Sequence, residues 1–309
     1  MSRVVVTGGA GFVGSHLCEA LLARGDQVVC IDNLSTSDGS NLEILDASPG
    51  FTFVRGDVSE DILVEGKVDV VAHLASPASP PEYMRLPLET LSVGSRGTEA
   101  CLQLSKRHDA RFLLASTSEI YGNPLVHPQS EAYWGNVSST GPRSVYDEAK
   151  RFGEALTMAY SRYESVNVGI VRIFNTYGPR LRQGDGRVVS NFVCQALSGL
   201  PLTIYGDGLQ TRSFCYIDDL INGLIAMIDR LDFVGPVNIG NPQEITVAEL
   251  ARRVLDTTGS TSEVVFSPSP EQDPARRKPD ITLARRELDW SPAVSLEDGL
   301  ERTVNWFRR

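Results

Sequence analysis

The sequence has few cysteines and no long hydrophobic run. Its 5 cysteines are odd in number, widely spaced and free of any Cys-x-x-Cys pair. This pattern argues against a zinc framework or a disulfide scaffold and indicates reduced thiols. No apolar run approaches the roughly 20 residues that a membrane-spanning helix needs. A strand-like run begins at Arg3, which leaves no room for a signal segment. We therefore expect no metal site, no membrane association and a cytoplasmic location.

Basic residues are also in the minority. The 29 lysines and arginines are outnumbered by 39 aspartates and glutamates, so the formal net charge is -10. We therefore expect no nucleic-acid partner, although an acidic protein can still hold a local basic pocket. Only 4 of the basic residues are lysines, so a lysine within a motif points to a need for its compact ammonium group.

The rest of the composition is that of a globular protein. The chain has 309 residues, of which 41% are hydrophobic and 22% charged, enough for one large or two ordinary domains. In the first half, short apolar runs alternate with helical patterns. Strands are expected at 3–7, 27–32, 51–55, 68–74, 111–116 and 167–174, and helices at 12–24, 86–107 and 144–163. This alternation predicts an α/β fold with a doubly wound parallel sheet, the Rossmann arrangement.

The pattern changes after about residue 177, where prolines and glycines separate shorter elements. We expect a dinucleotide-binding domain over residues 1–176 and a second, smaller α/β substrate domain over residues 177–309. A helical pattern is visible at 217–228, and we expect the stretch of about 213–240 to pack back on the first domain.

A glycine-rich turn follows the first expected strand. Gly8 would permit the tight turn, Gly11 would let the backbone approach a pyrophosphate, and Gly14 would permit close packing of helix and sheet. Asp32 ends the second strand, where it would accept hydrogen bonds from ribose hydroxyls and repel a 2′-phosphate. Because Asn33 follows with no arginine nearby, we expect the cofactor to be NAD rather than NADP.

Tyr146 and Lys150 lie four residues apart and therefore on one helix face. A free tyrosine is a poor base at neutral pH, but a nearby ammonium and an oxidised nicotinamide would lower its pKa. The alternative is a surface pair on an amphipathic helix, because such a spacing also arises by chance. Thr117, after the fifth strand, would hydrogen-bond the substrate hydroxyl that Tyr146 deprotonates; taken alone, it is better explained as a strand-end cap.

The glycine turn, Asp32, Thr117, Tyr146 and Lys150 resemble the extended short-chain dehydrogenase/reductase family that acts on nucleotide sugars. Longer stretches narrow the resemblance, at residues 73–81, 114–122, 127–131, 172–180, 185–192 and 277–280. Together they resemble the UDP-glucuronate decarboxylases of that family over nearly the whole chain. One departure is visible, since relatives usually carry Lys and Asn where this chain has Ser92 and Gly94.

The resemblance implies that a hydride moves from sugar carbon 4 to NAD⁺, which leaves a 4-keto sugar. A 4,6-dehydratase would need an acid where Ser118 stands, and a serine cannot serve near neutral pH. A 4-epimerase would not need Glu119. A 4-keto-glucuronate is a β-keto acid, so it loses carbon dioxide once its carboxylate is desolvated and the enolate is stabilised.

We therefore expect NAD-dependent decarboxylation of UDP-glucuronate to UDP-xylose, with NAD regenerated in each cycle. A 4-epimerase or 4,6-dehydratase of the same family is the alternative. A catalytically silent nucleotide-binding module is a third possibility, against which the intact Tyr146 and Lys150 pair speaks.

The resemblance also implies residue roles. Glu119 and Ser118 would hold the ring and relay protons, and Arg277 would lie near the glucuronate carboxylate. The expected catalytic residues are Thr117, Ser118, Glu119, Tyr146, Lys150, Asn175 and Arg277. The expected cofactor-binding residues are Gly8, Gly11, Phe12, Val13, Gly14, Asp32, Asn33, Asp57, Val58, Leu74, Ala75, Ser76, Tyr146, Lys150 and Thr176. The expected substrate-binding residues are Tyr83, Asn175, Arg187, Asn191, Tyr205, Arg212 and Arg277.

Among the substrate-binding residues, Arg187 and Arg212 would contact the diphosphate, Tyr205 would flank the uracil, and Tyr83 would reach the sugar. By the same resemblance, we expect a homodimer in which the helices at 86–107 and 144–163 of two chains form a four-helix bundle.

Overall fold

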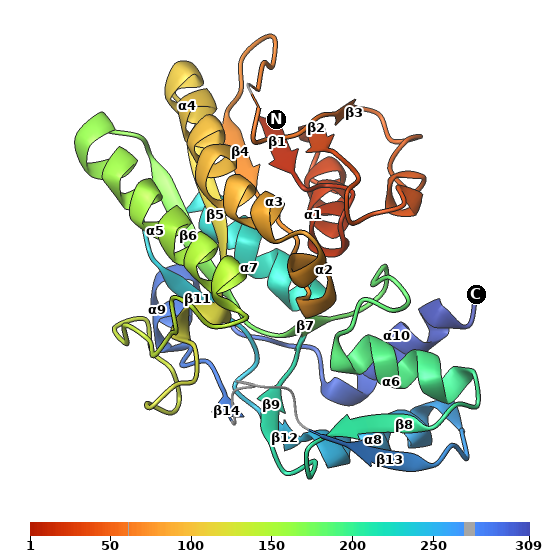
Figure 1. Ribbon diagram of the computed structural model, residues 1–309. Helices are drawn as coiled ribbons and strands as arrows, with labels where there is room; N and C mark the ends of the chain where they lie inside the picture. The colour runs from red at the N-terminus through yellow and green to blue at the C-terminus, as the bar shows by residue number, and fades with distance from the viewer. Residues whose placement is uncertain (61, 269–275) are drawn as a thin grey trace.

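A seven-stranded sheet forms the centre of the molecule in the computed structural model, which describes residues 1–60, 62–268 and 276–309 (Figure 1). Its strands are β1 (Arg3–Thr7), β2 (Gln27–Asp32), β3 (Phe51–Arg55), β4 (Val70–His73), β5 (Arg111–Thr117), β6 (Val168–Ile173) and β11 (Val237–Ile239). All neighbours are parallel, in the order β11-β6-β5-β4-β1-β2-β3. The predicted α/β fold with a doubly wound parallel sheet is confirmed.

Helices cover both faces of this sheet. On one face α1 (Phe12–Ala23) and α7 (Ile217–Asp229) pack together, and on the other α4 (Thr98–His108) and α5 (Ser144–Glu164) lie side by side (Figure 1). Successive strand residues alternate between two separate hydrophobic clusters, so Val4 and Val6 of β1 face α1 while Val5 faces α4. A valine-rich strand buried on both faces is what a parallel sheet requires.

The sheet has one strand more than the six that were predicted. Its edge strand β11 has only 3 residues, and it pairs with β6 through Val171 and Ile173. Such a short run leaves no clear periodicity in the sequence. Strand β11 follows α7 in the chain. The segment from Ile217 to Ile239 therefore belongs to the main sheet and its covering helices, although it comes later in the chain than the small elements between residues 177 and 216.

The expected helix at 86–107 is divided. The chain forms α3 (Pro87–Ser92), a π-helical turn η2 (Val93–Gly97) and then α4. A Cβ at Gly94 would lie 2.6 Å from the Cβ of Ala149. Because glycine has no side chain, Gly94 in place of the Asn that is usual in relatives lets this turn approach α5 closely, next to Lys150.

Smaller elements build the second half. Helices α6 (Val188–Leu197), α8 (Val247–Thr258) and α10 (Leu296–Phe307) pack together beside the pair β8 (Leu202–Tyr205) and β13 (Val264–Ser267). A second small sheet has the order β12 (Glu244–Thr246), β9 (Thr211–Ser213), β14 (Arg276–Arg277). A further pair joins β7 (Thr176–Tyr177) to β10 (Cys215–Tyr216), and α9 (Thr282–Leu288) packs against α7 and β11.

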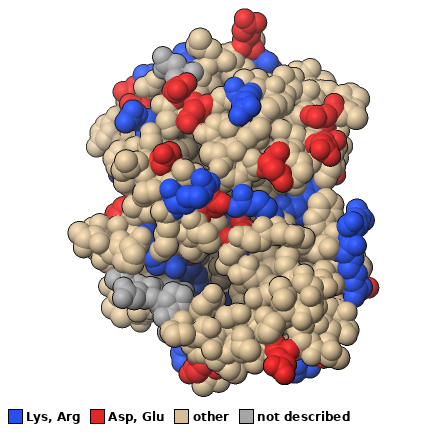
Figure 2. Space-filling view, turned by 45° about the vertical axis from the view of Figure 1, so that its right-hand side comes forward, with Lys and Arg blue, Asp and Glu red and all other residues tan. Residues whose placement is uncertain are grey.

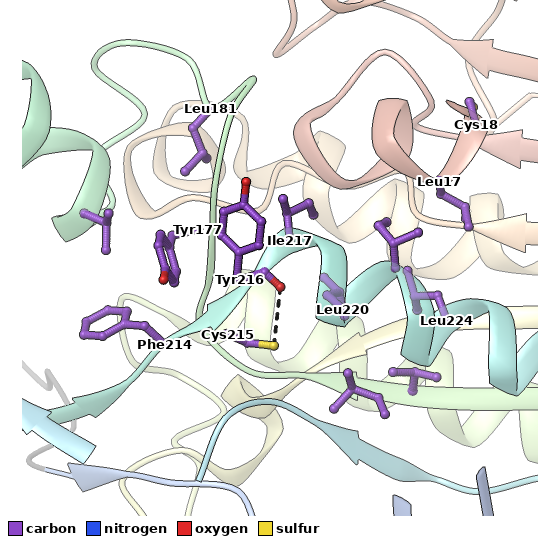
Figure 3. Close-up of a cluster of buried hydrophobic side chains, with 14 of the residues drawn as sticks. Leu17, Cys18, Tyr177, Leu181, Phe214, Cys215, Tyr216, Ile217, Leu220 and Leu224 are labelled. Atoms are coloured by element: carbon purple, nitrogen blue, oxygen red, sulfur yellow. Dashed lines mark hydrogen bonds between the residues drawn. The ribbon is translucent and has the colours of Figure 1, made fainter. Parts of the chain in front are cut away.

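The hydrophobic core is continuous between the two halves. Figure 3 shows Leu17 of α1 next to Leu220 and Leu224 of α7, and the cluster continues through Tyr216 to Phe214. All of these side chains are buried. In the described part of the chain, no helix is both long enough and apolar enough to cross a membrane.

Candidate active site

A cavity of about 600 Å³ lies at the carboxyl edge of the main sheet, where ligands of doubly wound sheets bind. It collects most of the residues expected to hold the cofactor. Those that line it are Gly8, Gly11, Phe12, Val13, Gly14, Asp32, Asn33, Asp57, Val58, Leu74, Ala75 and Ser76.

The glycine turn forms the floor of this cavity. Gly8 has φ +73°, and a Cβ there would lie 2.7 Å from the backbone of Ala75. A Cβ at Gly14 would lie 2.1 Å from the carbonyl oxygen of Gly8. Helix α1 begins at Phe12, and no side chain caps its first amides. A turn that a Cβ would block, next to unsatisfied amides at a helix N-terminus, fits the pyrophosphate of a dinucleotide.

Asp32 is held at the rim by backbone amides. Its carboxylate accepts hydrogen bonds from the amides of Ala10 (3.0 Å) and Leu34 (2.9 Å). Burial raises its pKa, and these two hydrogen bonds oppose the change. Nearby, Asn33 donates to the carboxylate of Asp57 (2.9 Å). Two fixed carboxylates at this end of the cavity suit ribose hydroxyls and disfavour a phosphate.

Tyr146 and Lys150 lie on α5, and both are buried. The Lys150 ammonium lies 5.9 Å from the centre of the Tyr146 ring and donates to the carbonyl of Ala115 (2.9 Å). Burial lowers the pKa of Lys150 to about 8. Burial also raises the pKa of Tyr146 to about 12, with Glu119 adding to the rise and a hydrogen bond to Thr117 opposing it. In the free chain, burial therefore outweighs the lowering that we expected from the ammonium.

Glu119 lies between two arginines. It belongs to η3 (Ser118–Tyr121), which follows β5, and forms ion pairs with Arg143 and Arg277. One Glu119 oxygen accepts from Arg277 Nη2 at 3.0 Å, and the other also pairs with that guanidinium. Burial alone would raise the pKa of Glu119, but Arg277 and Arg143 lower it to about 2. Glu119 is therefore ionised at neutral pH.

Two further residues belong to this cluster and were not predicted, Arg143 and Asp147. Burial and the charge of Glu119 raise the pKa of Asp147 to about 7, while Arg143 and Arg277 oppose the rise. Its Oδ1 atom is buried and has no hydrogen-bond partner among the residues that the structure describes. Both residues lie within three positions of Tyr146, and that proximity is the only signal by which the sequence could have identified them.

Tyr83 covers the Tyr146 ring. It lies on α2 (Pro80–Arg85), and the two rings stack with their centres 5.1 Å apart and their planes at 7°. Tyr83 is 1% exposed, and within the described parts of the chain its buried hydroxyl has no hydrogen-bond partner. A buried hydroxyl that lacks a partner beside the candidate base is suited to a ligand's polar group.

The remaining expected residues lie on several different elements. Ser118 is buried next to Glu119; Asn175 and Thr176 follow β6, where the Thr176 hydroxyl donates to the Phe174 carbonyl. Arg187 lines the cavity and donates to the Ala78 carbonyl (3.3 Å). Among the described residues, Arg187 is the one expected substrate residue that lines the cavity. The other six are not in its lining, namely Tyr83, Asn175, Asn191, Tyr205, Arg212 and Arg277.

Arginines line the cavity together with carboxylates. Figure 2 shows lysine and arginine side chains gathered along the hollow between the upper and lower parts of one face, with acidic side chains among them. Arg180, Arg182 and Arg187 line the cavity, and so do acidic residues such as Asp32 and Glu82. Among the described residues, no group of three or more His, Cys, Asp or Glu side chains is arranged to hold a metal ion. The three arginines offer guanidinium groups of the kind that bind phosphates.

Comparisons with known proteins agree on one family. The model of the NAD dependent epimerase/dehydratase family matches residues 4–240. UDP-glucuronic acid decarboxylase 1 from Arabidopsis thaliana is 53% identical over 306 residues, which cover 99% of this chain and 70% of that protein. UDP-glucuronic acid decarboxylase 1 from Xenopus tropicalis is 50% identical over 307 residues, covering 99% of this chain and 72% of that protein.

A solved structure is similar over its whole length. The UDP-glucuronic acid 4-epimerase from Bacillus cereus, in complex with UDP-glucuronic acid and NAD, is 31% identical, with a TM-score of 0.85 and coverage of 99% of both chains.

Proposed function

Because the chain belongs to the NAD dependent epimerase/dehydratase family, we propose that it decarboxylates UDP-glucuronate to UDP-xylose through a 4-keto intermediate. The predicted family and its NAD cofactor are thereby confirmed. The observation that carries the proposal is the identity of about half of all residues, over 99% of the chain, with UDP-glucuronic acid decarboxylases.

In the oxidation half of the reaction, Tyr146 is the base. When bound, NAD⁺ would supply the hydride acceptor for the oxidation of carbon 4. Tyr146 takes the proton of the carbon 4 hydroxyl, and Thr117, which hydrogen-bonds it, helps to orient that hydroxyl. Lys150 has a pKa of about 8 and so remains mostly an ammonium at neutral pH. This ammonium and the positive nicotinamide oppose the effect of burial and lower the pKa of the phenol.

The decarboxylation half belongs to the cluster around Glu119. Two arginines face one ionised carboxylate there, and the neighbouring Asp147 has a pKa of about 7. The cluster therefore carries spare positive charge, which suits a second carboxylate, that of the glucuronate. Arg277 binds near this group, and Ser118 and Glu119 hold the ring and relay protons to carbon 5. Burial of the site desolvates the carboxylate, which favours loss of carbon dioxide.

The second half of the chain, residues 177–309, supplies the nucleotide-sugar groove in this proposal. Arg187 and Arg212 hold the diphosphate, and Tyr205, half exposed at the end of β8, flanks the uracil. Asn175 and Asn191 bind the sugar side of the substrate, and Tyr83 offers its partnerless hydroxyl to the ring. Lys150, Tyr146 and Thr176 complete the nicotinamide end of the cofactor site.

Incubation with UDP-glucuronate, followed by mass spectrometry, tests the function. We expect the mass of UDP-xylose, release of carbon dioxide and no steady accumulation of reduced cofactor. A new species of unchanged mass that separates from UDP-glucuronate on chromatography would identify a 4-epimerase instead, and loss of water from UDP-glucose or dTDP-glucose would identify a 4,6-dehydratase. An absence of turnover with all three sugars would leave a nucleotide-binding module.

We also propose a homodimer in which the continuous helical stretch α3-η2-α4 and the helix α5 of two chains form a four-helix bundle. The outer side of these helices carries large apolar side chains, including Leu88 (75% exposed) and Phe152 (50% exposed). Covering them would recover hydrophobic free energy. In sedimentation equilibrium the chain should be a dimer and the Phe152→Glu variant a monomer; a monomeric wild type would exclude this assembly.

A cytoplasmic location is part of the proposal. All 5 cysteines are free thiols, including Cys18 and Cys30, whose sulfurs interact. Free thiols that lie near one another are typical of a reducing compartment.

A further inference from the structure

Two buried polar residues, Gln129 and Asn238, have no part in the proposed reaction. Both are 0% exposed. Gln129 lies in the 127–131 stretch, one of the stretches by which the sequence resembles its family. A buried amide costs free energy unless its hydrogen bonds are made, so the partners of these side chains show what they hold in place.

Gln129 forms several hydrogen bonds to the segment that follows Arg277. Its amide donates to the carbonyl of Lys278 (2.9 Å), and its side-chain oxygen accepts from the amide of Lys278 (2.9 Å). Its own carbonyl accepts from the amide of Asp280 (2.8 Å). The side-chain Nε2 donates to the carbonyl of Val126 (2.7 Å), which orients the side chain.

The side chain of Asn238 links these hydrogen-bonded residues to the segment that contains Glu119. Its Nδ2 donates to the carbonyls of Gln129 (3.0 Å) and Asp280 (3.1 Å). Its Oδ1 accepts from the hydroxyl of Tyr121 (2.8 Å), which lies two residues after Glu119 in η3. One side chain on β11 therefore connects the backbone after Arg277 to the turn that carries Glu119.

Within the described residues, few backbone hydrogen bonds hold the segment around Arg277. Strand β14 (Arg276–Arg277) pairs with β9. The carbonyl of Arg277 accepts a hydrogen bond from Ser213 (3.2 Å). The bonds that Gln129 and Asn238 make to residues 278–280 also support this segment.

We propose that Gln129 and Asn238 are positioning residues that fix Arg277 against Glu119 for the decarboxylation step. This inference rests on the proposed function of Arg277. Displacement of a positioned group by about 1 Å can slow a reaction about a hundredfold, because the group then no longer matches the transition state. The two amides act at a distance from the substrate, since all their hydrogen bonds are made within the protein.

The test is a double-mutant cycle between Gln129→Met and Arg277→Ala. Methionine is close to glutamine in size but can neither accept from Lys278 nor donate to Val126. Single-turnover release of carbon dioxide from carboxyl-labelled UDP-glucuronate should fall roughly tenfold to a hundredfold in Gln129→Met. The rate of carbon 4 oxidation, read from cofactor absorbance, should change less than about threefold, because oxidation depends on Tyr146.

In the Arg277→Ala background, Gln129→Met should cause no further loss of carbon dioxide release, because its effect passes through Arg277. An equal loss in both backgrounds, or an equal loss in both reaction steps, would overturn the proposal. Gln195→Met is the matched control: Gln195 also accepts from a backbone amide, that of Thr203 (3.2 Å), but it links α6 to β8 away from Glu119. We expect its rates to match the wild type.

If Gln129→Met does not fold, Asn238→Asp enters the same cycle. Aspartate keeps the acceptor for Tyr121 but loses both donors to Gln129 and Asp280. Amide hydrogen exchange gives a readout independent of activity: exchange at Lys278 and Asp280 should be faster in either variant, and unchanged exchange would overturn the proposal. A wild type that releases no carbon dioxide would instead refute the proposed function, while the exchange result would still decide whether these residues hold the segment.

Discussion

Glu119→Gln should destabilise the protein at neutral pH. The substitution keeps the shape of the side chain but removes its charge. Burial alone would raise the pKa of Glu119, but Arg277 and Arg143 lower it from 4.5 to about 2. Since one pKa unit corresponds to about 1.36 kcal/mol, the ionised carboxylate contributes about 3 kcal/mol to the free energy of unfolding at pH 7. The side chain is only 16% exposed, so solvent screens these pairs little.

The pH dependence of this effect has a definite sign. The pKa of Glu119 is lower in the folded chain than in the unfolded chain, so its contribution is complete above about pH 5 and is lost as the pH falls towards 2. Glutamine resembles the protonated acid. The difference in unfolding free energy between wild type and variant should therefore shrink from about 3 kcal/mol at pH 7 to about 2 kcal/mol at pH 3.5.

Urea unfolding followed by circular dichroism measures this difference at each pH. Glu249→Gln is the matched control. Glu249 also lies between two arginines, Arg252 and Arg253, and its pKa is likewise about 2, but it lies at the surface of α8 where solvent screens the pairs. The reasoning is refuted if Glu119→Gln is no more destabilising than this control, or if its effect is the same at pH 7 and pH 3.5.

Three further substitutions test the oxidation half and the cofactor site. Tyr146→Phe should lower turnover roughly 10²–10⁴-fold, because the base is removed while the stacking with Tyr83 remains; turnover at the wild-type rate would exclude Tyr146 from the mechanism. Asp32→Ala should weaken NAD binding and reduce the preference over NADP, because the carboxylate that repels a 2′-phosphate is lost; an unchanged ratio of the two affinities in calorimetry would contradict this role. Gly14→Ala should abolish NAD binding and lower the melting temperature, since its Cβ would lie 2.1 Å from the Gly8 carbonyl oxygen; normal NAD binding would show that the turn can yield.

Features that depend on neighbours along the chain were open to prediction. The glycine turn follows from three glycines at set spacings after a strand, and the crowding at Gly14 comes from Gly8 in the same turn. The shared face of Tyr146 and Lys150 follows from helical periodicity alone. The parallel sheet follows from apolar strands that alternate with helices.

The division of the helix at Val93 could not be predicted, because its cause lies on another helix. Gly94 reads as a weak helix former in any sequence window. Only the packing of η2 on α5 shows that a larger residue there would meet Ala149. The same holds for β11, whose 3 residues become a strand because β6 offers an unpaired edge.

The charge state of the site was likewise beyond the sequence. The burial of Tyr146 and Lys150 raises the pKa of one and lowers that of the other, opposite to the effect expected from their proximity. The burial of Tyr146 and Lys150 depends on the surrounding helices and, for Tyr146, on the stacked ring of Tyr83. These contacts form only when the chain folds.

The sequence by itself determined the sheet, the dinucleotide turn and the family, because these depend on short-range patterns and on long similar stretches. The tertiary structure alone decided which of the chain's arginines meets Glu119. Arg277 lies 158 positions away from Glu119, and Gln129 and Asn238 form hydrogen bonds to the backbone that follows Arg277. The physical reason is that ion pairs and buried hydrogen bonds join segments that are brought close only when the core has formed.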